Sequence, residues 1–416
     1  MSSLHYQNQS LHMEAVPLSA IAKAVGTPVY VYSKQAILHN LQTYTQAFKA
    51  TPHQLCYAVK ANGNLSILKC LADAGAGFDV VSIGELHRVI AAGGDPQKTV
   101  FSGVGKTEAE LREAISLNIY CIDVESEPEC ERLAHLAETL NQSVNIAIRV
   151  NPNIDAKTHA HISTGLSSNK FGIDSAAVLP LAKHLQTKTH LKLIGLAAHI
   201  GSQITDIQPL LTSAEHLIAL ATALQAFNIH IKHINIGGGL GIQYQNETPP
   251  SVQAYADAIH QRFKNTHYSL ILEPGRAIIG NAGCLLTQIE YLKTTPQKEF
   301  AVINAGMNDL IRPTLYDAWQ RILPVAQKNA PEKTYDIAGP VCESADFLGK
   351  DRKLAIASGD LLAIDCAGAY GFSMSSNYNA RCRPAEVLVD GDRFKIIRQR
   401  ETIEECLNNE RMCLES

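Results

Sequence analysis

Short apolar runs alternate with longer amphipathic segments along the first two thirds of the chain, a rhythm typical of a parallel sheet with crossover helices. Between these runs, residues 108–118 and 214–227 repeat apolar side chains at helical spacing. Because eight parallel strands close a barrel, residues 34–280 are predicted to form a (β/α)8 TIM barrel. The eight strand-like runs are 55–59, 78–82, 100–103, 120–124, 144–150, 193–199, 233–236 and 269–273.

The rhythm changes after residue 280, where apolar runs follow one another with few long helices between them. This pattern predicts a second, mostly β domain, a sandwich or small barrel, made of residues 1–33 and 281–416. Residues 390–392, Asp-Gly-Asp, separate two runs as a hairpin turn would, since glycine tolerates positive φ. The β-branched and aromatic run 29–33 precedes the barrel, or pairs into the second domain instead. The main runs of this part are 284–292, 300–304, 361–366 and 385–398.

The composition is that of an ordinary globular protein, with 46% hydrophobic residues, 18% charged residues and a net charge of −4. Basic residues form no run of the kind that follows a phosphate backbone, and tryptophan occurs once. Neither nucleic acid nor an anionic membrane is therefore an expected partner. Chemistry on a small molecule is the default expectation.

Ten cysteines are present, with no CxxC pair and no regular spacing, which favours reduced thiols. Residues 1–10 have no basic stretch followed by an apolar one, and nowhere do eighteen apolar residues run together. A cytoplasmic location is predicted.

Lys60 follows the first strand-like run of the predicted barrel. An amine at the rim of an apolar wall is desolvated, which disfavours its charged form and makes it a usable Schiff-base nucleophile. A lysine in this position can equally be a snorkelling surface residue. The residues at the ends of later strands decide between a Schiff-base lysine and a surface lysine, because the carboxyl ends of barrel strands converge on one site.

Glycines follow the seventh predicted strand at Gly237, Gly238, Gly239 and Gly241. Without Cβ atoms, their backbone N–H groups can approach an anion closely, and the loop after strand seven of a barrel is a common phosphate site. Arg276, or its neighbour Gly275, could add to such a cradle. As a bare string, a glycine cluster is more often a turn. Its place in the predicted barrel favours phosphate.

Glu273 and His199 end two further strands of the predicted barrel. A buried carboxylate needs a cationic or hydrogen-donating partner, and either a ligand's protonated ring nitrogen or a nearby arginine would serve Glu273. The imidazole of His199 can stack on a flat ligand, or it can be a hydrogen-bonded core histidine.

Together, a Schiff-base lysine, a phosphate cradle, a stacking ring and a carboxylate for a ring nitrogen describe a site for pyridoxal 5′-phosphate, with no metal assigned. A carboxylate keeps the pyridine nitrogen protonated, so the ring can accept the electrons of a carbanion. This favours decarboxylation, whereas a racemase gains from limiting the lifetime of the carbanion.

Segments 57–62, 199–203, 237–242, 273–280 and 339–344 resemble the motifs of the diaminopimelate decarboxylases, which are pyridoxal-phosphate enzymes of fold type III, alanine racemase-like. The resemblance covers nearly the whole chain and keeps the order of the motifs. It implies that Lys60 carries the cofactor as a Schiff base, that His199 stacks on its ring, and that the active site forms between the subunits of a head-to-tail homodimer. The other cofactor-binding residues that it implies are Ser202, Gly237, Gly238, Gly239, Glu273, Gly275, Arg276 and, from the second domain, Tyr370.

The same resemblance implies a carboxy-lyase that converts meso-2,6-diaminopimelate at its D-centre to L-lysine and carbon dioxide, the last step of lysine biosynthesis. The distal end of this substrate bears a carboxylate and an ammonium, so its pocket needs cations and an anion together. Arg312 and Tyr316 lie four apart and would share a face of a helical turn, with Pro313 suited to its first turn. Without the resemblance, this segment would be a solvated helix start. By resemblance, Arg276, Arg312 and Tyr316 hold the distal carboxylate, Glu343 holds the distal ammonium, and Tyr370 contacts the substrate as well as the cofactor.

Cys342 and Glu343 end a strand-like run of the second domain. An isolated cysteine beside an acid is usually a packed thiol. In the family that the chain resembles, this cysteine donates the proton that replaces carbon dioxide, a task for a weak acid placed on one face of the ring.

Three residues depart from the pattern of that family without removing a proposed catalytic group. Asn304 stands where an aspartate is usual, Ala345 replaces a glycine and Cys382 replaces a proline. Three alternatives stay open: an ornithine or arginine decarboxylase of the same fold, a non-catalytic pyridoxal-phosphate-binding relative, and a barrel aldolase. Arg312 would repel the cationic tails of the first, a mimic should lose Lys60 or Cys342, and an aldolase has no need of Glu273.

Overall fold

The computed structural model describes residues 3–156, 164–166 and 169–414. Contacts between residues divide the chain into two compact units. The first comprises residues 38–242 and 248–278, and the second comprises residues 1–37, 243–247 and 279–416.

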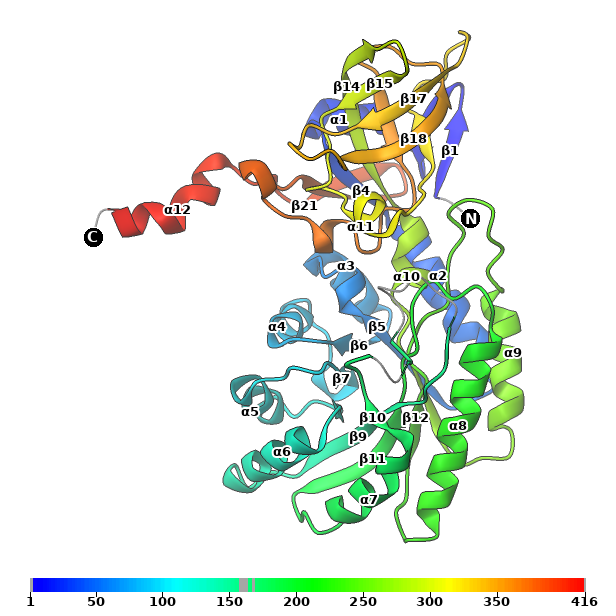
Figure 1. Ribbon diagram of the computed structural model, residues 1–416, viewed down its shortest axis with the longest axis vertical. Coiled ribbons are helices and arrows are strands. Elements are labelled where there is room, and N and C mark those ends of the chain that lie inside the picture. The colour runs from blue at the N-terminus through cyan, green and yellow to red at the C-terminus, as the bar shows by residue number, and fades with distance from the viewer. Residues whose placement is uncertain (1–2, 157–163, 167–168, 415–416) are drawn as a thin grey trace. The chain divides into compact units, whose positions relative to one another are not determined.

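Eight parallel strands form a closed barrel in the first unit, as the sequence predicts (Figure 1). Each strand pairs with its neighbour along the chain, β13 pairs with β5 to close the ring, and the short β10 (Ile173–Asp174) adds to the edge of β9. The barrel strands are β5 (His53–Ala58), β6 (Gly77–Val80), β7 (Thr99–Phe101), β8 (Cys121–Val124), β9 (Val144–Asn151), β11 (Leu191–Ala197), β12 (His233–Asn235) and β13 (Ser269–Leu272).

Helices follow the barrel strands and cover the outside of the ring (Figure 1). Several begin where the sequence provides a hydroxyl cap: the side chains of Ser82, Thr107, Ser126 and Ser251 each accept a hydrogen bond from a backbone N–H three residues on. The helices are α2 (Lys34–Ala47), which starts in the second unit, α3 (Leu65–Asp73), α4 (Ile83–Ala91), α5 (Glu108–Ser116), α6 (Glu127–Thr139), α7 (Ser175–Leu185), α8 (Gln208–Gln225), α9 (Val252–Phe263) and α10 (Arg276–Ile279), with short 3-10 turns at Val59–Ala61 and Pro96–Lys98.

The side chains inside the barrel change from apolar to polar along its axis. Small clusters of apolar side chains fill part of it, including Cys56, Val100 and Ile271. Nearer the carboxyl ends of the strands, buried polar residues take over: Asp79, Asp123, Asn235 and Glu273. Polar groups concentrated at that end mark the place where barrel enzymes carry their chemistry.

The second unit is mostly β structure, as the sequence predicts, around a core that includes Leu11, Val31, Leu286 and Val387. The run 29–33 forms β4 (Val29–Ser33), which pairs with β14 and β20 of this unit. The predicted hairpin is present, because Asp390 pairs with Arg393 across Gly391, whose φ is +66°. The remaining strands are β1 (Leu4–Gln7), β2 (Ser10–Met13), β3 (Val16–Pro17), β14 (Gly283–Thr294), β15 (Glu299–Ile303), β16 (Ile322–Pro324), β17 (Lys333–Ala338), β18 (Phe347–Leu354), β19 (Leu361–Ile364), β20 (Ala385–Asp390) and β21 (Arg393–Arg398).

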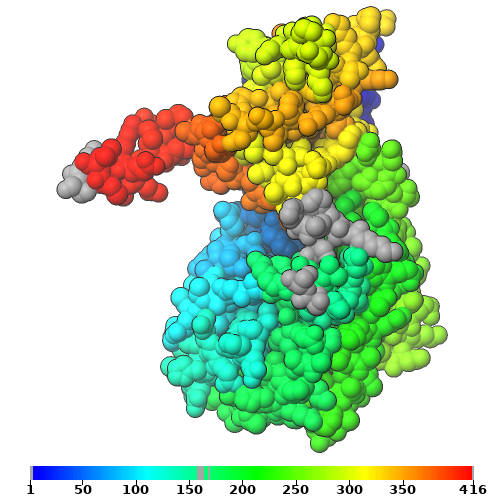
Figure 2. All heavy atoms as spheres, in the orientation of Figure 1, coloured from blue at the N-terminus to red at the C-terminus, as the bar shows by residue number. Residues whose placement is uncertain are grey.

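Helices are few in this unit: α1 (Leu18–Val25), α11 (Arg312–Tyr316) and α12 (Ile403–Leu414), with 3-10 turns at Gly280–Ala282, Phe372–Met374 and Tyr378–Ala380. The last helix, α12, is red in Figures 1 and 2, and none of its residues is buried. None of the helices in the described part of the chain combines the length and apolar character that a bilayer-crossing segment needs.

Candidate active site

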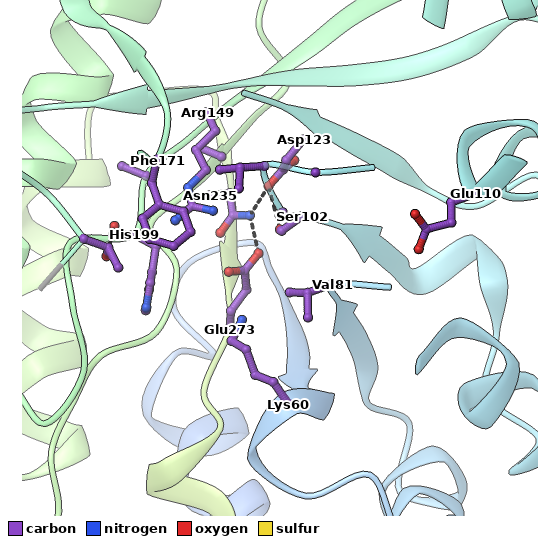
Figure 3. Close-up of a pocket in the computed structure, with 16 residues that line it drawn as sticks. Lys60, Val81, Ser102, Glu110, Asp123, Arg149, Phe171, His199, Asn235 and Glu273 are labelled. Carbon is purple, nitrogen blue, oxygen red and sulfur yellow. Dashed lines mark hydrogen bonds between the residues drawn. The ribbon is translucent and has the colours of Figure 1, made fainter. Parts of the chain in front are cut away.

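A cavity of about 440 Å³ opens at the carboxyl ends of the barrel strands. Strand ends from around the ring supply its walls, so residues far apart in the sequence face one space (Figure 3). Its lining includes Lys60, Val81, Ser102, Glu110, Asp123, Arg149, Phe171, His199, Asn235 and Glu273. The structure thus brings together three residues singled out from the sequence: Lys60, His199 and Glu273.

Lys60 lies in the 3-10 turn that follows β5, and 32% of its side chain is exposed. Its Nζ forms an ion pair of 2.5 Å with Oδ2 of Asp79, a fully buried residue of β6. This environment differs from the apolar wall expected from the sequence, because a buried carboxylate lies at contact distance from the amine. Asp79 also fixes the direction in which the lysine points.

Glu273 follows β13 and is 7% exposed. Its Oε1 accepts a hydrogen bond of 2.6 Å from Nδ2 of Asn235, and burial, followed by the charge of Asp79, raises its pKa to about 7. The arginine partner considered above is engaged elsewhere, since Arg149 pairs with Glu125 at 2.7 Å. Glu273 therefore presents an acid whose proton is easily exchanged near neutral pH.

Asp123 is a second buried acid in this wall, and the sequence reasoning missed it. Its Oδ2 lies 3.3 Å from both Ser102 Oγ and Asn235 Nδ2, while its Oδ1 is buried with no hydrogen-bond partner among the described residues (Figure 3). Burial, followed by the charge of Glu273, raises its pKa well above the usual range. Asp79 and Asp123 could have been found, because each interrupts a short apolar run that reads as a buried strand.

His199 follows β11 and turns one ring nitrogen toward the glycine loop. Its Nδ1 accepts a hydrogen bond of 3.3 Å from the N–H of Gly238, and its backbone oxygen accepts one of 2.7 Å from Thr164 Oγ1. Burial, then the charges of Lys60 and Arg149, hold its pKa well below the usual value. The imidazole is therefore neutral, and its flat ring lines the cavity.

The glycine loop after β12 passes close to two other strand ends. A Cβ on Gly238 would lie 2.2 Å from the backbone oxygen of Glu273, and one on Gly239, whose φ is +112°, would lie 2.7 Å from that of Gly201. Glycine is therefore required at both positions. The N–H of Gly237 donates to Asn235 Oδ1 at 2.9 Å and that of Gly238 to His199, so these two amides hold the walls of the cavity.

Ser202 and Arg276, both expected at the cofactor, are in contact in the first unit. Nη2 and Nε of the buried Arg276 lie 3.1 and 3.3 Å from Ser202 Oγ. Gly275 precedes this arginine at a tight approach, since a Cβ there would lie 3.0 Å from that of Ala61. The turn into α10 thus packs against the turn that carries Lys60.

Arg312 and Tyr316 begin and end α11 of the second unit, so they span one helical turn, with Pro313 in its first turn as the sequence predicts. Arg312 is 5% exposed, and its guanidinium lies 4.6 Å above the ring of Tyr244. Burial and stacking fix this cation in one orientation.

Cys342 and Glu343 are exposed and follow β17, which ends at Ala338, earlier than the sequence suggested. Residues of the loop after Phe372–Met374 hold both: the N–H of Cys342 donates to Asn379 Oδ1 at 2.8 Å, and Tyr378 Oη donates to the carboxylate of Glu343. Tyr370 lies just before this loop, with a φ of +55°.

The fold and the cavity define a pyridoxal-dependent decarboxylase of the barrel type, because a family model described as "Pyridoxal-dependent decarboxylase, pyridoxal binding domain" matches residues 34–280. The diaminopimelate decarboxylases of Neisseria meningitidis and Vibrio cholerae are 51% and 50% identical to the chain, each over 97% of it, and are covered over 100% and 97% of their own lengths. The chain belongs to the diaminopimelate decarboxylase family.

Solved structures agree with this assignment. The diaminopimelate decarboxylase of Helicobacter pylori complexed with L-lysine has a TM-score of 0.92 at 38% identity, covering 95% of this chain and 100% of its own. The diaminopimelate decarboxylase of m. jannaschii, also in co-complex with L-lysine, has a TM-score of 0.94 at 37% identity, covering 98% of this chain and 97% of its own.

The residues of the cavity fit pyridoxal phosphate. Lys60 offers an amine and Glu273 a carboxylate from neighbouring strand ends, and the neutral ring of His199 lies in the same wall. Among the described residues Glu273 forms no ion pair within contact distance, and the hydrogen bond to its carboxylate comes from the neutral amide of Asn235. Such a buried carboxylate suits the protonated nitrogen of a pyridine ring, which is the role expected of Glu273 from the sequence.

Proposed function

We propose that this enzyme decarboxylates meso-2,6-diaminopimelate at its D-centre and releases L-lysine and carbon dioxide. The observation that carries the proposal is the convergence of Lys60, His199 and Glu273 on one cavity in a chain 51% identical to a diaminopimelate decarboxylase. L-Lysine, the product, is also the molecule bound in the two solved relatives.

When bound, pyridoxal phosphate supplies an electron sink for the pair left on the α-carbon as the bond to the carboxylate breaks. Lys60 would hold the cofactor through Nζ, and Asp79, which pairs with that amine at 2.5 Å, would orient it. Glu273 keeps a proton on the ring nitrogen, with its own carboxylate held by Asn235. His199 would lie against the ring of the cofactor, and the other residues of the barrel unit expected to bind it are Ser202, Gly237, Gly238, Gly239, Gly275 and Arg276.

Recognition of the distal end of the substrate needs both signs of charge. Arg276, Arg312 and Tyr316 bind the distal carboxylate, and Glu343 binds the distal ammonium, while Tyr370 contacts both substrate and cofactor. Arg312 is buried and stacked, which supports its role as a cation of fixed orientation. Such a cation favours binding of a substrate with a distal carboxylate and disfavours one with a purely cationic tail.

Cys342 replaces the lost carboxylate with a proton. Its thiol is exposed and its backbone is held by Asn379, so the donor is accessible to a bound substrate yet anchored. The active form is a head-to-tail dimer in which each site uses residues of both subunits. A cytoplasmic location remains the prediction made from the sequence.

The test is the product balance of the purified enzyme with pyridoxal phosphate. Meso-diaminopimelate should give lysine and carbon dioxide in equal amounts, while ornithine and arginine give neither amine nor gas in quantity. Comparable turnover of ornithine would refute the specificity. No turnover of any of the three would favour the non-catalytic relative.

A further inference from the structure

Two thiols of the second unit lie close together outside the proposed catalytic groups. The Sγ atoms of Cys382 and Cys406 are 4.0 Å apart, and both residues are partly exposed. Cys382 follows the 3-10 turn Tyr378–Ala380, and Cys406 lies near the start of α12. The pair therefore connects a loop to the C-terminal helix.

This loop is the one that holds the proposed proton donor and the proposed ammonium-binding carboxylate. Asn379 accepts the N–H of Cys342, and Tyr378 donates to Glu343. Asn377 of the same loop donates to Cys406 Sγ at 3.7 Å and to Glu401 at 2.7 Å. A change at the thiol pair thus reaches Cys342 and Glu343 through three or fewer residues of backbone.

The helix on the other side of the pair has no buried face. None of the residues of α12 is buried, and Leu407, Met412 and Leu414 are exposed. A disulfide bond is about 2.05 Å long, so closure needs the two sulfur atoms to approach by about 2 Å. A helix without a buried face can supply this shift at little cost in packing.

We propose that Cys382 and Cys406 form a reversible disulfide that lowers the activity of the enzyme. Closure replaces the contact between Asn377 and Cys406 and draws the loop toward α12, which displaces Asn379 and Tyr378 from Cys342 and Glu343. The effect on activity rests on the proposed function of Cys342 and Glu343, whereas formation of the bond does not.

The oxidant is a small-molecule disulfide such as glutathione disulfide. One protein thiolate attacks it, its S–S bond breaks and one glutathione leaves. The second protein thiolate then attacks the mixed disulfide and releases the other glutathione. The two protein thiols lose two electrons and two protons, and one glutathione disulfide becomes two glutathione thiols. A dithiol reductant reduces the protein disulfide back to two thiols and is itself oxidised to a disulfide.

The test compares the holoenzyme before and after incubation with glutathione disulfide, with Cys382→Ser, Cys406→Ser and, as a matched control on the same helix, Cys413→Ser. Peptide mapping should find Cys382 joined to Cys406 in the wild type and in Cys413→Ser. In both, kcat/KM for meso-diaminopimelate should fall by about a hundredfold, the order expected when reacting groups are misplaced by an ångström, and dithiothreitol should restore it.

Cys382→Ser and Cys406→Ser should keep their activity under the same treatment. Equal loss in these variants would place the oxidation on Cys342 and overturn the proposal, as would a mapped disulfide with unchanged kcat/KM or the absence of the link. An inactive reduced enzyme contradicts the proposed function instead, and the mapping still decides whether the bond forms.

Discussion

Glu273 is held at the junction of three other polar side chains. Asn235 links it to Asp123 through one amide nitrogen, and Asp79 adds a charge of the same sign. Burial and the charge of Asp79 disfavour the ionised form of Glu273 as long as no cation is bound beside it. A protonated ring nitrogen provides that cation, so the wall that destabilises the free carboxylate favours binding of the cofactor.

The raised pKa of Glu273 predicts how the stability of the protein, stripped of cofactor, depends on pH. The folded pKa of about 7 lies above the ordinary 4.5, so the folded state binds this proton more tightly than the unfolded chain does. The free energy of unfolding should therefore fall as pH rises from 4.5 toward 7, by an amount on the order of 3 kcal/mol from this group. Urea unfolding at a series of pH values measures it.

Glu273→Gln should remove this part of the pH dependence, because the amide stays neutral throughout. Glu138→Gln, a change at an exposed glutamate of α6, is the control and should keep the wild-type profile. An unaltered slope in Glu273→Gln would show that the carboxylate ionises without penalty.

Which site residues the sequence reveals depends on where they stand relative to the strands. Lys60 follows a strand-like run, and His199 and Glu273 end two others, so the predicted barrel alone places all three at one end of the ring. Asp79, Asp123 and Asn235 lie within or at the last residue of strands, where a polar side chain faces inward only because of the barrel's register. Their partners come from strands remote in the sequence, so only the fold shows the network.

At the scale of elements, all eight barrel strands were predicted, with ends displaced by up to two residues. The helix predicted from residue 214 begins at Gln208, because Pro209 occupies its first turn and apolar Leu210 and Leu211 extend its buried face. Asn304, noted as a departure, has a structural reason: its Nδ2 donates to Thr27 Oγ1 at 2.8 Å, which an aspartate could not do.

The helix α11 carries a prediction on substrate binding. Arg312→Ala should weaken binding of meso-diaminopimelate by about 2 to 5 kcal/mol, because it leaves the distal carboxylate without its buried partner. Arg312→Lys should recover part of the loss, since it restores the charge but not the planar fork. The Michaelis constant, with a direct binding measurement on a slow variant, provides the readout.

Arg393→Ala is the matched control for charge, because this arginine side chain is 89% exposed. It should bind substrate as the wild type does. A Michaelis constant unchanged by Arg312→Ala would remove Arg312 from the substrate pocket and reopen the ornithine alternative.

At the scale of the whole molecule, Lys60 belongs to the barrel unit, whereas Cys342 belongs to the second unit. Local sequence pattern predicts each unit, because each has its own core and its own rhythm of strands. How two such units cooperate in catalysis depends on surfaces that no periodicity encodes. In the proposed dimer, one subunit supplies Lys60 to an active site and its partner supplies Cys342 to the same site.

A shared site predicts complementation between two inactive variants. Lys60→Ala and Cys342→Ala each lack an essential group, so each homodimer should be inactive. After subunit exchange, half of the dimers are mixed, and in each of these one of the two sites is built from the two intact groups, so activity should recover to about a quarter of the wild type. Mixing Lys60→Ala with a Lys60→Ala, Cys342→Ala double variant is the control and should stay inactive, because every site then lacks the lysine. If the single variants exchange subunits, as sedimentation and mass labelling can establish, yet remain inactive, then each site draws both groups from one chain and the shared arrangement is wrong.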